Sequence, residues 1–393
     1  SANTEGAKQA ENIPILKEAP PPPPPKIATR IGGLAVVYYE EAMLNSLIRC
    51  GARCLATCIV VVTAAVGSAQ IRYKVFDTGV NFSPTAINQS GLMAGHNGTR
   101  SYFYERENGT LQIPSYPNQS QIWAEDVNAL GRVAGSAYRE DGLLVAFTWS
   151  VFTGVEQVAD FPYISQAYGI NDYGHVVGRF VRNENFYYDA FLWKPSLGWI
   201  ILPPLQPQWS AGAKKVYNSD EVLGYSQNGP NSTTSVIWRP NGDIIDLGSL
   251  PGQDQNFAND LNNLGQVCGG TLGNFGDIAY VWTPGQGYAP IWNPYQSGAF
   301  ISAHGINDQG DVTGALSVPG VGTRGFVKKA NGSVQLLNDL LHSNSAGWNI
   351  TWSLDINNKG QISARGTKNG QTRGVLLQPV KDRTPISIGG VGR

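Results

Sequence analysis

Cysteine is scarce in this chain, and its placement rules out a disulfide framework. There are four cysteines in 393 residues, and Cys50, Cys54 and Cys58 all precede the repeated part of the sequence. The remaining Cys268 stands where neighbouring repeats carry Val or Ala, so we interpret it as a small buried hydrophobic residue. Without an internal disulfide, the repeated part must owe its stability to packing.

Charge is also sparse, and neither sign dominates. Charged residues make up 15% of the sequence, with 28 Lys and Arg against 29 Asp and Glu, and no basic stripe is present. We therefore expect no nucleic-acid partner. The four histidines fall at unrelated repeat positions, and the sequence has no Gly-x-Ser-x-Gly elbow, phosphate loop or dinucleotide fingerprint. The sequence predicts no metal and no cofactor.

Long hydrophobic runs are missing as well. The main apolar run, at about 55–66, follows Met43 and two arginines and precedes small residues. A run this short favours a secretory signal over a membrane span. We predict a signal peptide at 43–69, which would send the protein to the periplasm, the cell surface or the medium without stable membrane insertion. Residues 1–42 would be an upstream segment, either a translated leader or disordered, and 381–393 a disordered tail.

The sequence is rich in repetition. The pattern Ala-x-x-Ile-Asn-x-x-Gly-x-Val-x-Gly recurs seven times after residue 80, most clearly from Ala167 to Gly178. The turn asparagine, or the residue in its place, recurs every 40 to 50 residues, at Asn88, Asn128, Asn171, Tyr217, Asn262, Asn307 and Asn357. A period of about 45 residues with strand-like content is typical of a β-propeller blade.

Each repeat divides into four strands. The first ends at the asparagine, and Asn-x-x-Gly forms a tight turn in which Gly supplies a positive φ. A Val-rich second strand follows, and then an apolar third strand that ends in an aromatic residue. A second turn containing Pro and Gly leads to a fourth strand such as 243–247. We place the third-strand aromatics in the core: Trp149, Trp193, Trp238 and Trp282.

The ends of the repeat array predict a closed ring. Repeat seven has a third strand at 374–377 but no convincing fourth strand after Pro379, whereas an unassigned strand at 71–77 precedes repeat one. This strand would complete the last blade and leave no open sheet edge. The predicted fold is all-β, a seven-bladed β-propeller of four-stranded blades over 70–380, closed by the N-terminal strand.

The motifs resemble those of the HAF family of probable extracellular bacterial repeat proteins. The resemblance rests on the repeated Ala-x-x-Ile-Asn-x-x-Gly-x-Val-Val-Gly element followed by Ala-Phe-Leu-Trp, as at 190–193, and it covers about residues 71 to 380. It implies export and a repeat architecture, and no defined chemistry. The chain departs from the pattern where Pro84 replaces Ala, and where Tyr217 and Asp220 replace the turn Asn and Gly.

The long loops are where we expect a function. The short turns should lie at one face of the ring and the longer connections at the other. The long connections carry aromatic residues beside amides, which suits stacking on sugar rings and hydrogen bonding to hydroxyls. The candidate ligand-binding residues are Tyr138, Tyr187, Tyr188, Trp209, Tyr225, Phe275 and Trp348. We hypothesise an exported, monomeric, non-catalytic protein that binds a glycan or a cell-envelope component; alternatively, these aromatics only cover the blade ends.

Two other classes of function remain open. Asp126, Asp260 and Asp355 lie two residues after the repeat's Ala, on the strand nearest the predicted channel, where carboxylates could act as acid and base in polysaccharide cleavage. Gly169 and Lys215 occupy the same position in other repeats, so we assign no catalytic residue. The third class is a scaffold for protein partners in the envelope.

Overall fold

The computed structural model describes residues 27–31, 34–37, 71–119, 121–161, 163–182, 187–229, 232–250, 253, 255–272 and 277–381. The chain divides into two units, Ser1–Ser68 and Ala69–Arg393. In the first, β1 (Ile27–Ile31) pairs antiparallel with β2 (Leu34–Val37). The predicted signal peptide, the rest of the upstream segment and the predicted tail beyond Lys381 lie outside the described residues.

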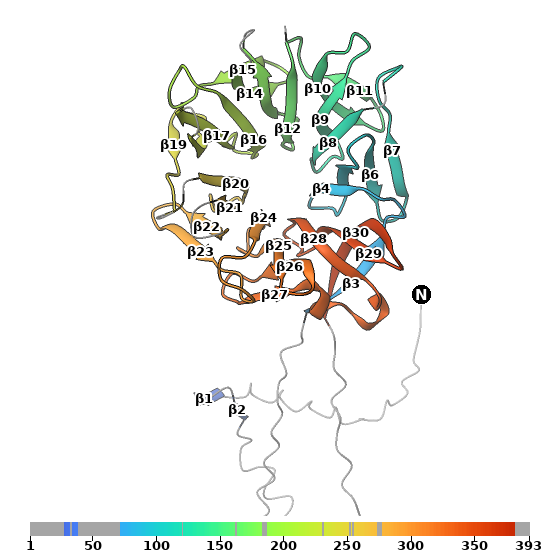
Figure 1. Ribbon diagram of the computed structural model, residues 1–393, viewed down its shortest axis with the longest axis vertical. Coiled ribbons are helices and arrows are strands. Elements are labelled where there is room, and N and C mark those ends of the chain that lie inside the picture. Colours follow the sequence, from blue (N-terminus) through green and yellow to red (C-terminus); the bar gives the residue numbers. More distant parts are fainter. Residues whose placement is uncertain are drawn as a thin grey trace, which may run out of the picture. The chain divides into compact units, whose positions relative to one another are not determined.

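The second unit is a seven-bladed β-propeller, as predicted (Figure 1). Its seven sheets each have four antiparallel strands, and the first strand of each blade lies innermost. Blade 1 consists of β4 (Ser83–Ile87), β5 (Met93–His96), β6 (Ser101–Glu105) and β7 (Gly109–Ile113). Blade 2 consists of β8 (Ile122–Val127), β9 (Val133–Tyr138), β10 (Leu144–Ser150) and β11 (Gly154–Gln157). Blade 3 consists of β12 (Ser165–Ile170), β13 (Val176–Val181), β14 (Tyr188–Lys194) and β15 (Gly198–Leu202). Blade 4 consists of β16 (Ala211–Val216), β17 (Val222–Gly229), β18 (Ser232–Trp238) and β19 (Ile244–Asp246). Blade 5 consists of β20 (Gln255–Leu261), β21 (Val267–Leu272), β22 (Ala279–Thr283) and β23 (Gly287–Ile291). Blade 6 consists of β24 (Ile301–Ile306), β25 (Val312–Val318), β26 (Gly322–Lys328) and β27 (Val334–Leu336). Blade 7 consists of β28 (Asn349–Ile356), β29 (Ile362–Lys368), β30 (Gln371–Lys381) and β3 (Ile71–Asp77).

The turn glycines adopt the backbone conformation that the motif predicts. Gly174, for example, has φ +76°, and its N–H donates to the Asn171 carbonyl at 3.0 Å. In blade 4, Asp220 takes this place with φ +63°, a conformation that Asp tolerates better than most residues. The turn signal in the sequence therefore marks a left-handed residue in every blade.

A β-bulge interrupts the first strand of every blade. Pairing with the second strand slips by one residue directly after the repeat's Ala, as between Ala124 and Asp126 in blade 2. The same slip occurs in the other six blades. The final Gly of the motif faces it: a side chain at Gly178 would overlap the Gln166 carbonyl oxygen. The second strand can therefore approach the bulged strand only where it carries no side chain.

The core lies between the blades. The buried apolar residues that the structure describes form seven clusters, and each cluster joins two neighbouring blades. Trp149 and Trp238 belong to this core, and Trp193 and Trp282 are half-buried against it. Cys268 is fully buried within the cluster between blades 5 and 6, as predicted. A blade therefore buries its faces only against its neighbours.

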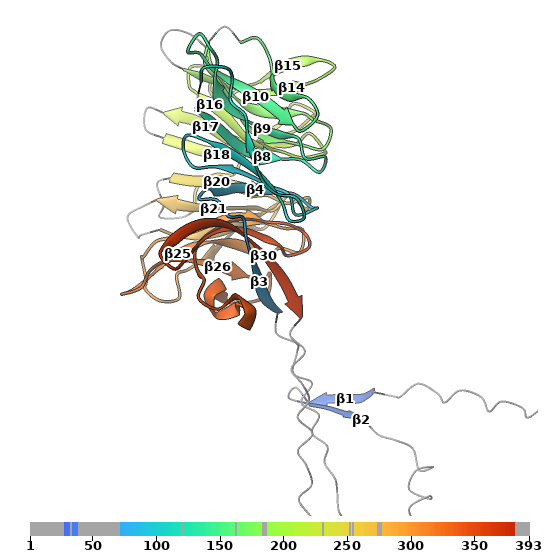
Figure 2. The same ribbon diagram turned by 90° about the vertical axis from the view of Figure 1, so that its right-hand side faces the viewer.

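The N-terminal strand closes the ring, as the sequence predicts. Strand β3 pairs antiparallel with β30 over its whole length, with Phe76 opposite Leu376 (Figure 2). Strand β30 is longer than expected and continues through Pro379. The neighbouring β29 pairs with β30 only as far as Leu377, so Pro379 needs no N–H on that side.

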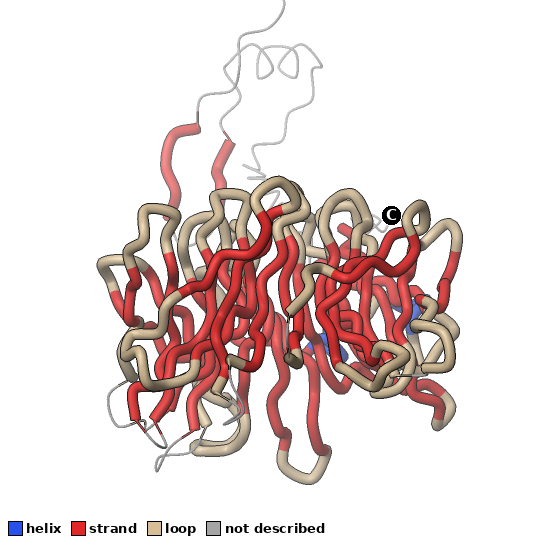
Figure 3. The backbone as a smooth tube through the Cα atoms, turned by 90° about the horizontal axis from the view of Figure 1, so that it is seen from above, coloured by secondary structure: helices blue, strands red, loops and turns tan. Residues whose placement is uncertain are grey.

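Two short 3₁₀ helices, which the sequence did not predict, cover the outer edge of β3. They are η1 (Leu337–Leu340) and η2 (Ser343–Ser345), drawn in blue in Figure 3. The His342 N–H donates to the Tyr73 carbonyl at 2.9 Å, and the Val75 N–H donates to the Ser345 hydroxyl at 2.8 Å. This cover protects the edge of the closing strand. Among the described residues, no helix has the length and apolar character needed to cross a bilayer.

Candidate functional site

Two circles of residues surround the ring axis. They arise from the β-bulge, because the two residues that follow the repeat's Ala both lie on the inner side of the first strand. We call the residues two places after the repeat's Ala the inner circle; they are Ala86, Asp126, Gly169, Lys215, Asp260, Gly305 and Asp355. We call the bulged residues one place earlier the bulge circle; they are Thr85, Glu125, Tyr168, Lys214, Asn259, His304 and Leu354. Four inner-circle residues, Asp126, Lys215, Asp260 and Asp355, line a cavity of about 270 Å³ together with the asparagine turns, and the bulge circle surrounds a second cavity of about 240 Å³. Lys215, Asp260 and Asp355 line both cavities.

The three inner-circle carboxylates brace neighbouring blades. Each accepts a hydrogen bond from the backbone N–H of the isoleucine in the following blade: Asp126 from Ile170 at 3.1 Å, Asp260 from Ile306 at 2.9 Å, and Asp355 from Ile87 at 3.0 Å. The last of these bonds crosses the ring closure. The sequence therefore located the channel carboxylates correctly, and their hydrogen bonds give them a structural role.

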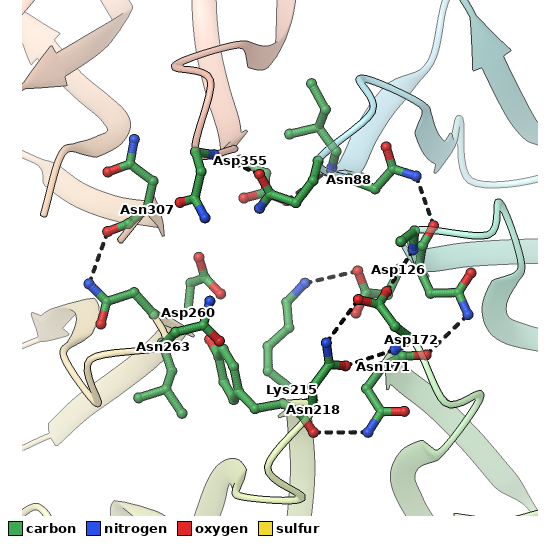
Figure 4. A pocket seen from close by; sticks show the side chains of 18 of the residues that line it. Asn88, Asp126, Asn171, Asp172, Lys215, Asn218, Asp260, Asn263, Asn307 and Asp355 are labelled. Carbon is green, nitrogen blue, oxygen red and sulfur yellow. Dashed lines mark hydrogen bonds and ion pairs between the residues drawn. The ribbon is translucent and has the colours of Figure 1, made fainter. Parts of the chain in front are cut away.

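Lys215 lies among these carboxylates (Figure 4). Its ammonium is 3.2 Å from Asp126 Oδ1. Burial alone would lower the pKa of Lys215, but the carboxylates of Asp126, Asp355 and Asp260 raise it above its ordinary value. Burial and the nearby Asp355 raise the pKa of Asp260 to about 7. At the centre of the channel, the Lys215 ammonium is therefore stabilised by three carboxyl groups, of which Asp126 forms the ion pair.

The turn asparagines form a hydrogen-bonded belt around the end of this channel (Figure 4). The Asn128 carboxamide donates to the Asn171 carbonyl at 3.0 Å, while its oxygen accepts from the N–H groups of Leu130 and Arg132. The donated bond repeats from blade to blade and crosses the closure, where Asn357 donates to the Asn88 carbonyl at 2.9 Å. The belt is interrupted in blade 4, because Tyr217 has no carboxamide.

The bulge circle holds the more reactive side chains. Glu125 lies 3.8 Å from His96 Nε2, and burial raises the pKa of its carboxyl to about 7. His304 donates from Nδ1 to the Ser353 carbonyl at 2.8 Å and stacks on Trp352, and burial lowers its pKa. Lys214 donates to the Ala258 carbonyl at 3.1 Å and to Asn259 Oδ1 at 3.0 Å. Among the described residues, no group of three His, Cys, Asp or Glu could hold a metal ion.

Beside the bulge circle, Arg179 organises a cluster of tyrosines. Its guanidinium donates to Gln166 Oε1 at 2.9 and 3.0 Å and to the Tyr225 hydroxyl at 2.9 Å. It also lies over the rings of Tyr188, at 4.3 Å from the centroid, and Tyr168, at 5.7 Å. We call these five residues the Arg179 cluster. Arg179 and Tyr225 also line a cavity of about 310 Å³ whose wall includes Lys214 and Phe257.

The predicted ligand-binding residues fall into separate groups. Tyr188 and Tyr225 meet at Arg179. Tyr187 and Trp209 are bridged through Arg182, whose N–H donates to the Tyr187 carbonyl at 2.7 Å and whose guanidinium donates to the Trp209 carbonyl at 3.3 Å. The structure thus brings the side chains of Tyr188 and Tyr225 to one guanidinium, whereas Tyr187 and Trp209 are linked only through their backbone carbonyls.

The other three do not join these groups. Tyr138 ends β9 in blade 2, where it packs edge-on against Trp123. Trp348 is buried in the cluster between blades 6 and 7, in line with the packing alternative for these aromatics. Phe275 lies outside the described residues.

Sequence reasoning missed the polar residues of this site. Gln166, Arg179 and Lys214 lie in strands, whereas the predicted ligand-binding residues were taken from the long loops and the predicted strand residues were only the aspartates. A signal was available, because the position after the repeat's Ala carries Glu, Lys or His in three blades where a strand at the centre of a ring would be apolar.

Comparison with known proteins places the chain by fold alone. No family model matches it, and no curated protein sequence matches it. Among solved structures, it is similar to a streptogramin B lyase (11% identity, 79% of this chain and 98% of that one, TM-score 0.50) and to virginiamycin B lyase from Staphylococcus aureus (9%, 78% and 99%, 0.50). It is also similar to the β-propeller domain of the Trilobed protease from Pyrococcus furiosus (8%, 76% and 96%, 0.51), which is described as having an open velcro topology. The present ring differs from that description, because β3 pairs with β30.

Proposed function

We propose that this chain is an exported, monomeric, non-catalytic protein of the HAF type that binds glycans at the long-loop face of its propeller. The Arg179 cluster, with Tyr168, Tyr188 and Tyr225 around one guanidinium beside an open cavity, is the observation that carries the proposal. Tyrosine rings offer flat apolar faces for sugar rings, and their hydroxyls with the Gln166 amide offer donors and acceptors for sugar hydroxyls. The binding site would lie on blades 3 and 4, next to the channel mouth.

A glycan array tests this function. Wild-type protein covering residues 70–393 should retain a defined set of glycans, and Tyr188→Ala or Tyr225→Ala should reduce binding about tenfold or more because each removes a stacking face. Tyr173→Ala is the matched control, since Tyr173 is 66% exposed in the Asn-x-x-Gly turn of blade 3, at the opposite face. Circular dichroism would verify that all variants fold. An array without retained glycans, or equal losses in the control, would contradict the proposal.

A polysaccharide-cleaving enzyme is the competing function. It is favoured by the raised pKa values of Glu125 and Asp260, which suit an acid at neutral pH. The bracing hydrogen bonds of the inner-circle aspartates favour binding alone. Incubating the glycans retained on the array with wild type and Asp260→Asn, and assaying for new reducing ends, separates the two. Release by wild type but not by Asp260→Asn would establish catalysis.

A scaffold for protein partners is the third possibility. It predicts that the Tyr188 and Tyr225 variants keep every activity of the wild type, because the partner would bind elsewhere. The array and the assay for new reducing ends together therefore distinguish all three classes.

A further inference from the structure

The cavity beside the Arg179 cluster has two cations in its wall. Arg179 comes from β13 in blade 3 and Lys214 from the bulge of β16 in blade 4. The other described residues that line it are neutral: Gly224, Tyr225, Thr233, Ser235, Asn256, Phe257 and Ala258. The cavity therefore carries positive charge of its own.

Neither cation forms an ion pair with a described carboxylate. Arg179 donates to the Gln166 amide and the Tyr225 hydroxyl, and Lys214 donates to a backbone carbonyl and the Asn259 amide. Their neighbours in the same blades behave differently, since Lys215 pairs with Asp126 and Lys194 with Asp220 at 2.6 Å. Glu125 and Asp260 share the channel cavity with Lys214 and act to raise its pKa, but neither forms an ion pair with it; Glu125 lies 3.8 Å from His96 Nε2 instead.

Half-buried cations whose hydrogen-bond partners are all neutral favour an anion. Removing a charge from water is costly unless an opposite charge meets it, and the neutral oxygens around Lys214 compensate only in part. Consistent with this, burial lowers the pKa of Lys214, and the adjacent Lys215 lowers it further. An anion bound between Lys214 and Arg179 would raise the pKa of Lys214 again, because it would stabilise the charged ammonium.

The remaining wall suits a sugar ring. Phe257 lies on β20 and keeps 39% of its surface exposed, so it offers an apolar face at the cavity. Tyr225 and Thr233, which carry hydroxyls, also line the cavity. A small inorganic anion would leave these groups unused, whereas an acidic sugar uses the charge, the apolar face and the hydroxyls together.

We propose that the cavity between Arg179 and Lys214 binds the carboxylate of an acidic sugar, such as a uronic acid, with the sugar ring against Phe257. This inference rests on the glycan-binding function proposed above and names the ligand class: the glycan recognised at this face carries a carboxylate, and Arg179 and Lys214 select for it.

The test uses an array on which each uronic-acid or sialic-acid glycan stands beside its carboxyl-reduced, neutral counterpart. Wild type should bind the acidic members about tenfold or more tightly, because charge-assisted hydrogen bonds are lost on reduction. Lys214→Gln and Arg179→Gln should lose this preference. Lys359→Gln makes the same charge change as Lys214→Gln at an exposed residue of the Asn357 turn and should keep the preference.

Thermal unfolding with small ligands supplies an independent readout. Sodium glucuronate should raise the midpoint of wild type and of Lys359→Gln, whereas glucose at equal concentration should not, and the shift should vanish in Lys214→Gln and Arg179→Gln. Circular dichroism of each variant verifies folding.

The outcomes separate this inference from the general function. Equal retention of acidic and neutral glycans would overturn the acidic-sugar assignment and leave glycan binding standing. An array without binding, together with a glucuronate shift that depends on Lys214, would refute the general function and support the cavity assignment. Sulfate that stabilises as well as glucuronate, or no glucuronate shift at all, would overturn the assignment.

Discussion

At the scale of single residues, the turn asparagine and the final glycine of the motif have different tasks. Asn128 is 3% exposed and uses both its carboxamide nitrogen and oxygen, so it joins its own turn to the next blade. Gly178 is required because the bulged strand approaches too closely for a side chain. Blade 7 carries Ala364 at the glycine position and has a second register slip, between Ile350 and Trp352. The motif therefore records the bulge as well as the turn.

Replacing a belt asparagine should destabilise the protein. Asn128→Ala removes the bond to the Asn171 carbonyl, which keeps the Gly174 N–H, and leaves the N–H groups of Leu130 and Arg132 unpaired; we expect a loss of about 3 kcal/mol in the free energy of unfolding. Urea unfolding measures it. Asn241→Ala, at an exposed turn residue bonded only to Asp243, should cost about 0.5 kcal/mol or less. Similar losses in both variants would show that the belt contributes no special stability.

Channel carboxyls should make stability fall as pH rises. Glu125 and Asp260 have pKa values raised to about 7, so between about pH 4 and 7 the folded protein keeps protons that the unfolded chain has lost. Unfolding then releases protons, and a higher pH favours it. Glu125→Gln should flatten this slope in urea titrations across that range, whereas Glu107→Gln, at an exposed turn residue, should leave it unchanged. A slope unaltered by Glu125→Gln would rule out its contribution.

At the scale of elements, the sequence predicted the strands and turns but not the bulges. Alternation and the Asn-x-x-Gly signal locate β12, its turn and β13, because the side-chain period and the positive φ leave traces in composition. The one-residue slip leaves its trace only in the final glycine of the motif, which does not show which residue of the first strand bulges, so the inward direction of Glu125 and Lys214 was not predicted. For Trp348 the sequence could not distinguish packing from ligand binding, because an aromatic residue in a long loop suits either role. The burial of its side chain in the structure favours packing.

The closing strand β3 should be held mainly by Tyr73. This side chain is 1% exposed in the cluster of blade 7, so Tyr73→Ala should cost about 3 to 5 kcal/mol through lost packing. Its buried hydroxyl has no hydrogen-bond partner, so Tyr73→Phe should cost little or stabilise slightly. Thermal unfolding compares both with Ile71→Ala, at a residue 37% exposed on the same strand. A Tyr73→Phe loss as large as that of Tyr73→Ala would indicate a hidden polar role for the hydroxyl.

At the scale of the whole molecule, the seam between blades 7 and 1 resembles the seams between blades 2 and 3 and between blades 5 and 6. Like them, it has an apolar cluster, an asparagine bond and a carboxylate bond. The two ends of the described ring are also adjacent, because Ile71 pairs with Lys381. The contacts between blades therefore continue around the whole ring, although the chain begins and ends the ring within blade 7.

A circular permutant should consequently fold. Joining residue 381 to residue 71 through a short linker and opening the exposed turn at 106–108 would make β7 the closing strand of blade 1 in place of β3 in blade 7. We expect one unfolding transition at a midpoint within a few degrees of that of the original, since in both proteins the closing strand pairs antiparallel with the third strand of its own blade. Calorimetry and size-exclusion chromatography check this. An aggregated or two-step permutant would show that the β3 seam is special.

Blade 4 breaks the likeness among the seven. It alone carries Tyr217 in the asparagine belt, Asp220 at the left-handed turn position, and two consecutive lysines in the channel wall. A ring of seven identical blades would offer a bound molecule seven equivalent orientations. Because blade 4 differs from the others, the acidic sugar proposed above would bind in one orientation, with its carboxylate toward Lys214.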